Sequence, residues 1–133
     1  MARELCESLW SQWEHALNMM EISIREFTPE QWSQGLSGFE TPAKVTYHNT
    51  DVIDFFFRED RETEYQWGHR FGKSWRALGD DEQPTQEEQL AYLVDLKVRV
   101  KAHFAALEDS QLYKPFEKRP TRLEFYLYAA RHR

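Results

Sequence analysis

Four segments of the sequence repeat apolar residues at the three- and four-residue spacing of an amphipathic helix. They cover residues 4–27, 42–61, 84–107 and 121–133. A threonine beside a proline begins each of the last three, which is typical of a helix N-terminus. No segment shows a convincing strand pattern. The sequence therefore predicts an all-α fold, an antiparallel four-helix bundle that forms a single domain over residues 1–133.

The fourth predicted helix is about half as long as the first and third. It begins at Thr121, and the sequence ends at Arg133, so we expect the last helix of the bundle to be truncated. A half-length helix leaves the far ends of its neighbours exposed. Either a homodimer or further chain beyond Arg133 would cover them.

Composition narrows the classes of partner. The formal net charge of −6 repels phosphate backbones, and the basic residues are dispersed, so nucleic acid is not expected as a partner. No run approaches the roughly 18 consecutive apolar residues of a membrane span, and the N-terminus lacks the pattern of a signal peptide. Cys6 is the only cysteine, which excludes an intrachain disulfide. These features predict a cytoplasmic protein that does not enter membranes.

Several catalytic motifs are missing. None of the five histidines has an acidic residue three positions before it, which excludes the paired Glu-x-x-His motifs of di-iron bundles. The sequence also lacks the His-Glu-x-x-His motif of zinc proteases and the Gly-x-Ser-x-Gly motif of many hydrolases. Gly72-Lys73-Ser74 matches the end of a phosphate-binding loop, but Trp67 stands where the first glycine is required.

Two histidines are predicted to face the core. His48 falls in the apolar stripe of the second helix, and His132 lies on the apolar face of the fourth. His15 is predicted to be a surface residue, and His103 a hydrogen-bonded residue at the edge of its helix. His48 and His132 have two possible interpretations, as unrelated core histidines or as ligands of a divalent metal. The residues alone do not decide between them, since such a metal site usually has three protein ligands. The stripe of the second helix comprises Val45, His48, Val52, Phe55 and Phe56.

The second and fourth segments resemble a known superfamily. Thr-Pro-Ala-Lys-Val-Thr-Tyr-His48, followed by Asp-Val-Ile-Asp-Phe-Phe-Phe, is similar to the second helix of the DinB and YfiT-like superfamily. Arg122-Leu-Glu-Phe-Tyr-Leu-Tyr-Ala-Ala-Arg-His132 is similar to the start of its last helix. The resemblance implies a DinB-like bundle in which His48 and His132 bind a divalent metal, Zn or Ni. The family's third histidine would fall at position 136, outside this sequence, so the chain as given is expected to bind metal weakly or not at all.

The same resemblance implies a function. Metal-binding members include transferases that activate a low-molecular-weight thiol, because a divalent cation lowers the thiol pKa. The chain is therefore expected to be a metal-dependent enzyme, a thiol-dependent S-transferase or a hydrolase. Arg70, Lys73 or Arg76 would either meet a carboxylate of the thiol or, as the favoured alternative, form a solvated basic patch. The alternative is a non-catalytic bundle that dimerises or binds a partner, with structural core histidines. A homodimer is expected under both hypotheses, because aromatic residues are abundant and the fourth helix is short.

Overall fold

The computed structural model describes residues 2–35 and 41–132. For His132 it describes the backbone but not the side chain. The described residues form helices and short 3-10 turns and contain no strand. This confirms the predicted all-α fold. The elements are α1 (Glu4–Glu26), α2 (Pro29–Trp32), α3 (Pro42–Phe56), η1 (Trp75–Ala77), α4 (Gln86–Ala105), η2 (Asp109–Tyr113) and α5 (Arg122–His132). None of these helices is long and apolar enough to cross a bilayer.

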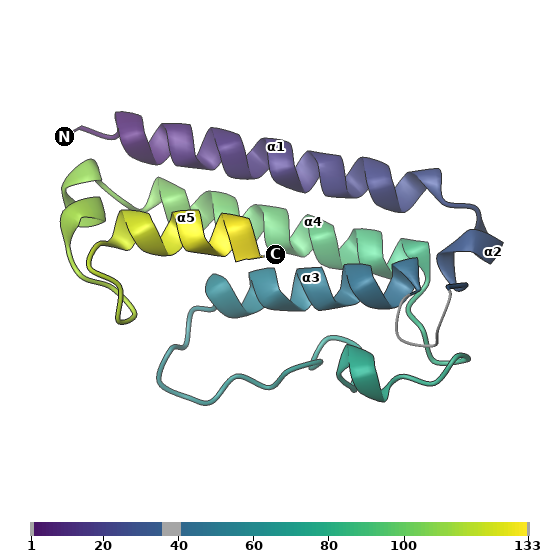
Figure 1. Ribbon diagram of the computed structural model, residues 1–133. Helices are drawn as coiled ribbons and strands as arrows, with labels where there is room; N and C mark the ends of the chain where they lie inside the picture. Colours follow the sequence, from purple (N-terminus) through teal and green to yellow (C-terminus); the bar gives the residue numbers. More distant parts are fainter. Residues whose placement is uncertain (1, 36–40, 133) are drawn as a thin grey trace.

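The long helices do not all alternate in direction (Figure 1). α1 and α4 are antiparallel, since the Gln86 side chain at the start of α4 donates to the Ile24 carbonyl near the end of α1, at 2.8 Å. α3 and α4 run parallel, since Thr50 pairs with Gln89 and, further along both helices, Asp54 pairs with Tyr92. The predicted antiparallel arrangement therefore holds for α1 against α4 but not for α3 against α4. Its cause is the crossover, residues 57–85, which returns along the length of α3 before α4 begins.

Side chains define where α3 starts and ends. The Thr41 hydroxyl accepts from the Lys44 amide at 3.1 Å, which caps the first turn. α3 was predicted to continue to Arg61, but it ends at Phe56. Arg58 donates to the Phe55 carbonyl and Arg61 to the Phe56 carbonyl, each at 2.6 Å. These guanidinium groups satisfy carbonyls that a continuing helix would have bonded internally.

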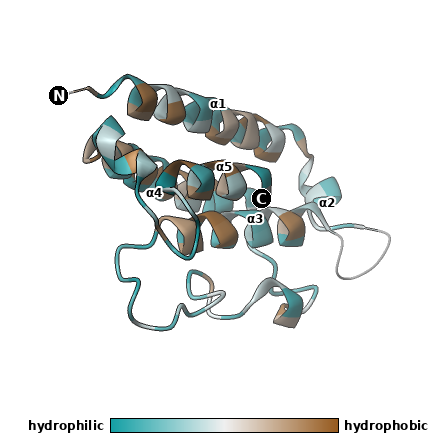
Figure 2. Cartoon of the chain, turned by 60° about the vertical axis from the view of Figure 1, so that its left-hand side comes forward, coloured by the Kyte–Doolittle hydropathy of each residue, from teal (hydrophilic) through white to brown (hydrophobic). Residues whose placement is uncertain are grey.

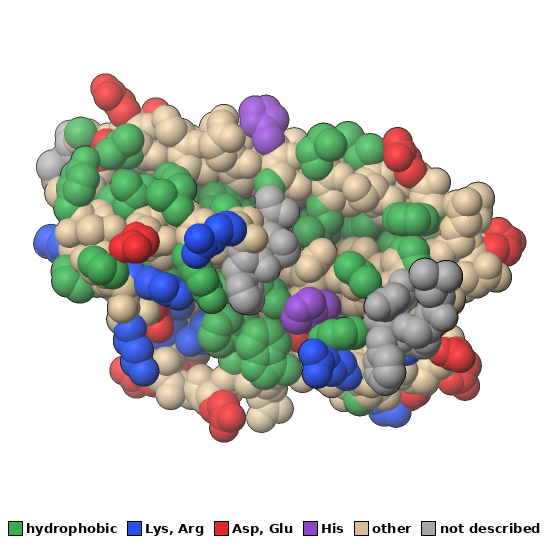
Figure 3. Space-filling view, viewed as in Figure 1, with side chains coloured by type: hydrophobic (Ala, Val, Ile, Leu, Met, Phe, Trp, Pro, Cys, Tyr) green, Lys and Arg blue, Asp and Glu red, His purple; other side chains and the backbone are tan. Residues whose placement is uncertain are grey.

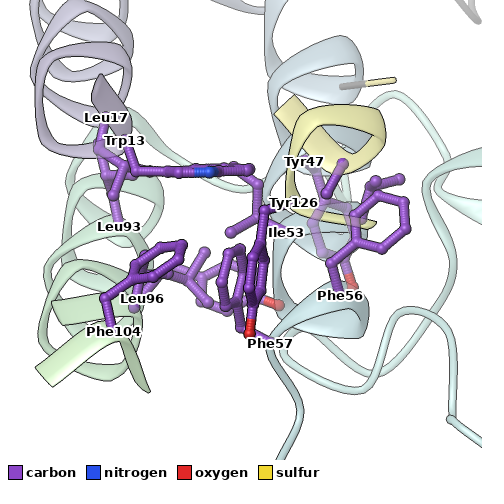
Figure 4. Packing of buried hydrophobic residues seen from close by; sticks show 14 of the residues in the cluster. Trp13, Leu17, Tyr47, Ile53, Phe56, Phe57, Leu93, Leu96, Phe104 and Tyr126 are labelled. Atoms are coloured by element: carbon purple, nitrogen blue, oxygen red, sulfur yellow. The ribbon is translucent and has the colours of Figure 1, made fainter. Parts of the chain in front are cut away.

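An aromatic cluster joins the four long helices (Figure 4). The rings of Phe57, just after α3, and Tyr126 of α5 are stacked, with centroids 6.0 Å apart. Trp13 of α1 meets Phe57 edge-on at 4.9 Å, and Phe104 of α4 meets Tyr126 at 4.8 Å. All four side chains are buried. Hydrophobic residues are concentrated on the helices, whereas the crossover is largely hydrophilic (Figure 2).

The buried face of α3 is more polar than the sequence predicted. Val45 was placed in the apolar stripe, but it is 45% exposed, and His48 is only half-buried. The most deeply buried positions instead include polar residues: Lys44, Tyr47, Thr50, Asp51 and Asp54. The last four contact the crossover or α4. The prediction is confirmed for Val52 and Phe56, which are buried, and was wrong for Val45. It missed the polar positions because a buried polar group stabilises a fold when other elements supply its hydrogen bonds, and apolar spacing does not detect that.

Candidate functional site

α3 places two carboxylates, Asp51 and Asp54, on the side that faces the crossover and α4. They stand three positions apart, so one lies about a helical turn beyond the other. Each residue is 2% exposed. Buried carboxylates require several donors, and these two obtain theirs from different parts of the chain.

Asp54 accepts three side-chain hydrogen bonds. Its donors are the Tyr92 hydroxyl at 2.5 Å, the Arg99 guanidinium, and Nε2 of His69 at 2.8 Å. Burial alone would raise the pKa of Asp54, but the hydrogen bonds from Tyr92 and Arg99 and the charge of Arg99 outweigh it, so the pKa is lowered. Asp54 is therefore held as a carboxylate. Burial and the bond to this carboxylate raise the pKa of Tyr92, which keeps its phenol protonated as the donor.

Asp51 has the opposite shift. It accepts from the Tyr65 hydroxyl at 2.6 Å and from the backbone amide of Gly68 at 2.8 Å. Burial raises its pKa more than these two bonds lower it, and the nearby charge of Asp54 adds to the rise. Gly68 has φ of 79°, in the left-handed region that glycine adopts without strain. Asp51 thus fixes the segment of the crossover that carries His69.

His69 stands between the buried carboxylate and an open cavity. Its side chain is 44% exposed, whereas that of Asp54 is 3% exposed. Because a carboxylate only accepts, Nε2 carries the proton of the hydrogen bond, and in a neutral ring Nδ1 then holds the free lone pair. The Tyr65 ring packs edge-on against the imidazole with centroids 5.4 Å apart. The cavity has a volume of about 460 Å³, and Asp54, Tyr65, His69 and Arg99 contribute to its walls.

The remaining wall of this cavity is rich in acids. Glu59, Asp60 and Glu64 line it. Arg58 also lines it, and no carboxylate of the described residues lies within hydrogen-bonding range of its guanidinium group. The charge of Arg99 is taken up by Asp54. The net field at the opening is therefore negative, which favours a neutral or cationic ligand over an anionic one.

The predicted metal ligands lie elsewhere. His48 is on the flank of α3, half-buried, with its ring 5.2 Å from that of Trp75 and tilted by 45°. The side chain of His132 lies outside the described residues, so the proximity of the predicted pair is untested. Among the described residues no three or more His, Cys, Asp or Glu side chains form a group that could hold a metal ion. The described residues alone therefore do not supply the three ligands of a metal site.

The other predicted residues have definite roles. Arg70 and Lys73 form surface ion pairs of 2.6 Å, with Asp95 and Glu82 respectively. Arg76 lies over the Trp75 ring with its guanidinium carbon 5.1 Å from the centroid. Whether any of the three meets the carboxylate of a thiol stays a prediction.

Both remaining histidines are as predicted. His15 is exposed on α1. Nε2 of His103 lies 2.5 Å from the Tyr126 hydroxyl, so this ring is a hydrogen-bonded residue at the edge of α4. His103 also lines a second cavity.

No family model, curated protein or solved structure matches this chain significantly. The resemblance to the DinB and YfiT-like superfamily therefore stays a prediction. Sequence reasoning did not single out Asp51, Asp54 or His69 as site residues. The available signal was the pair of acids three apart inside an otherwise apolar stretch, since an acid among such neighbours is either exposed or bonded to partners from elsewhere.

Proposed function

We propose that the chain is a proton-transfer enzyme in which His69 is the general acid–base group and Asp54 is its positioning residue. One observation carries the proposal, the contact between Asp54 and His69. The Asp54 carboxylate is 3% exposed and accepts hydrogen bonds from Tyr92 and Arg99, and it also bonds the imidazole of His69, whose side chain is 44% exposed in an open cavity. A buried carboxylate that fixes a half-exposed imidazole is the arrangement that general-base catalysis requires.

The chemistry follows from the hydrogen bonds. With Nε2–H donated to Asp54, Nδ1 of His69 takes a proton from a substrate in the cavity. The resulting imidazolium is stabilised by the carboxylate, which Tyr92 and Arg99 keep ionised. The same proton returns from Nδ1 to the product or its leaving group, so the enzyme is restored. The acidic opening favours a neutral or cationic polar substrate of small size.

A purely architectural role for these contacts is the competing explanation, because they also anchor the crossover to α3. The two roles separate at His69. Its replacement by glutamine keeps a donor that can reach Asp54 but removes the basic nitrogen. An anchoring role predicts lost stability with no chemical consequence, whereas a catalytic role predicts lost reactivity in a folded protein.

Two measurements test the proposal. Long-range ¹H–¹⁵N NMR should show the neutral His69 ring protonated at Nε2, and Asp54→Asn should weaken that preference. Hydrolysis of p-nitrophenyl acetate, a small neutral ester, should be faster for the parent than for His69→Gln, since general-base catalysis contributes roughly 10²–10⁴-fold on a true substrate. His15→Gln, which removes an exposed histidine on α1, is the matched control. Equal hydrolysis by the parent and His69→Gln would refute the proposal.

The metal-dependent function that the resemblance implies is a separate candidate. It is supported by the position of His48, which lies midway along α3 against the Trp75 ring. An aromatic side chain in that place would form one wall of a metal site at His48. A DinB-like thiol S-transferase or hydrolase would bind Zn or Ni through His48 and His132. Metal analysis of the purified protein and of His48→Ala tests it: stoichiometric metal lost with His48 supports it, and none in either refutes it. Sedimentation of the same samples tests the expected homodimer.

A further inference from the structure

A second cavity lies beside the first, where α3 and α4 end and α5 begins. Its volume is about 710 Å³, and four arginines line it: Arg58, Arg61, Arg99 and Arg122. Glu59 and Asp95 also line it. Two of these residues are already in ion pairs, Arg99 with Asp54 and Asp95 with Arg70. Several lysine and arginine side chains lie at this end of the molecule, with acidic side chains among them (Figure 3). This cavity is basic, in contrast to the acidic one beside it.

Two guanidinium nitrogens here are buried without an acceptor. Nε of Arg58 and Nη1 of Arg61 have no hydrogen-bond partner among the described residues. Glu117 Oε1 lies 3.6 Å from Arg61 Nη1, within ion-pair range but too far for a hydrogen bond. The other terminal nitrogen of Arg61 is fixed, because it donates to the Phe56 carbonyl. A buried donor without an acceptor costs free energy, and an anion would remove that cost.

Arg122 is held close to Arg61 by aromatic contacts. Both guanidinium carbons lie over the ring of Phe116, at 4.9 Å for Arg61 and 4.1 Å for Arg122. Nε of Arg122 also donates to the Tyr126 hydroxyl at 2.7 Å. These contacts hold both guanidinium groups against the same ring before any ligand arrives, and burial together with the charge of Arg122 lowers the pKa of Arg61. Such preorganisation lowers the entropic cost of binding an anion.

His103 lines the same cavity as a neutral imidazole. Since Tyr126 accepts from Arg122, its hydroxyl proton is free to be donated to Nε2 of His103, which leaves the proton of the ring on Nδ1. Burial and the charges of Arg122 and Arg61 lower the pKa of His103 to about 4, so the ring adds no further positive charge at neutral pH. The cavity thus combines two fixed guanidinium groups with a neutral imidazole.

We propose that this second cavity binds a phosphate-class anion, either free phosphate or a small phosphomonoester, through Arg61 and Arg122. Guanidinium groups present paired N–H donors that match the oxygens of a phosphate, and their bonds to it are charge-assisted. The phosphate site uses different side chains from the proposed proton transfer, since its proposed ligands Arg61 and Arg122 do not line the first cavity and His69 does not line the second. It assigns a ligand to a chain whose overall charge of −6 gives no hint of one.

Isothermal titration calorimetry with inorganic phosphate and with phenyl phosphate, at an ionic strength held constant with sodium chloride, tests the site. Both should bind the parent, and Arg61→Gln and Arg122→Gln should each weaken binding about tenfold or more. Arg25→Gln is the matched control, since Arg25 is a surface residue of α1 with a side chain 61% exposed. His69→Gln should bind phosphate like the parent, which separates this proposal from the proposed function.

The two probes also distinguish the source of the anion. Tighter binding of phenyl phosphate assigns the cavity to a phosphomonoester, and tighter binding of inorganic phosphate assigns it to the free ion. Binding of neither probe by the parent overturns the proposal, as does equal weakening by Arg25→Gln and Arg61→Gln. If the Arg61 and Arg122 variants do not fold, the side-chain Nε–H NMR signals of these two arginines in the parent decide. Signals that phosphate shifts no more than chloride does would refute the site.

Discussion

Asp54→Asn is the most informative single change, because it removes one charge and keeps the shape of the side chain. The carboxylate is 3% exposed and accepts from Tyr92, Arg99 and His69. The amide has one oxygen in place of two, so it can retain part of the bonding. Its NH₂ group also presents donors where the parent presents an acceptor.

The expected loss of stability follows from these bonds. Hydrogen bonds to a charged group contribute about 1.5–3 kcal/mol each, and breaking a fully buried ion pair costs about 3–5 kcal/mol. The Arg99 side chain is 32% exposed, so water can rehydrate its charge when the carboxylate is lost. We therefore expect a loss of about 2–4 kcal/mol. Against a typical domain stability of roughly 5–15 kcal/mol, the variant should still fold.

Urea denaturation followed by circular dichroism measures this loss as a lower midpoint at an unchanged m-value. The matched control is Asp95→Asn, which removes a carboxylate 56% exposed from its ion pair with Arg70. Such a surface change should alter the free energy of unfolding by no more than about 0.5 kcal/mol. Equal effects of the two substitutions would refute the view that Asp54 anchors the crossover and α4.

The pH dependence gives a second check on the same pair of carboxylates. Folding lowers the pKa of Asp54, so its contribution to stability is complete above the unfolded-state value, about 3.8, and is lost as the pH falls through the folded pKa. The difference between the parent and Asp54→Asn should therefore be full at neutral pH and shrink below about pH 4. Folding raises the pKa of Asp51, so its charge costs stability above the folded pKa, and that cost fades as the pH falls through that value. Asp51→Asn should remove this opposite trend.

Four further substitutions test the backbone and the core. Gly68→Ala should lower the free energy of unfolding by more than about 2 kcal/mol in the same urea assay, because the φ of Gly68 is +79° and a Cβ would lie 2.3 Å from the backbone of Lys73. Gly72 has φ of +88°, but a Cβ there would meet open space, so Gly72→Ala should cost only about 1 kcal/mol. Thr85→Ala removes the capping box of α4 and should lower the free energy of unfolding by about 1 kcal/mol, without changing the circular dichroism of the folded state. Phe57→Ala should cost about 3–5 kcal/mol, seen as a lower thermal midpoint, and a loss under 1 kcal/mol would contradict its central place in the core.

The sequence predicted the helices well, because the spacing of their apolar residues and the adjacent threonine and proline at the start of α3, α4 and α5 are local signals. The direction of α4 relative to α3 is not local, since it depends on how far residues 57–85 travel before the next helix begins. The end of α3 was also missed, because the side chains of Arg58 and Arg61 accomplish it from outside the helix. The candidate site was missed for the same reason: the donors to Asp54 come from the crossover and from α4.

The parallel course of α3 and α4 is what makes the site possible. A helix that followed α3 directly would run back antiparallel to it and would not need the crossover. Here the crossover lies along α3, which lets Asp51 bond the Gly68 amide and brings His69 to Asp54. Because α4 then starts beside the beginning of α3, its residue Arg99 reaches the same carboxylate from the other side. A change that frees the crossover, such as Gly68→Ala, should therefore displace His69 before it unfolds the bundle, and the His69 NMR signals should shift at urea concentrations where the helical circular dichroism is intact. Simultaneous loss of both signals would show that the site and the bundle form one cooperative unit.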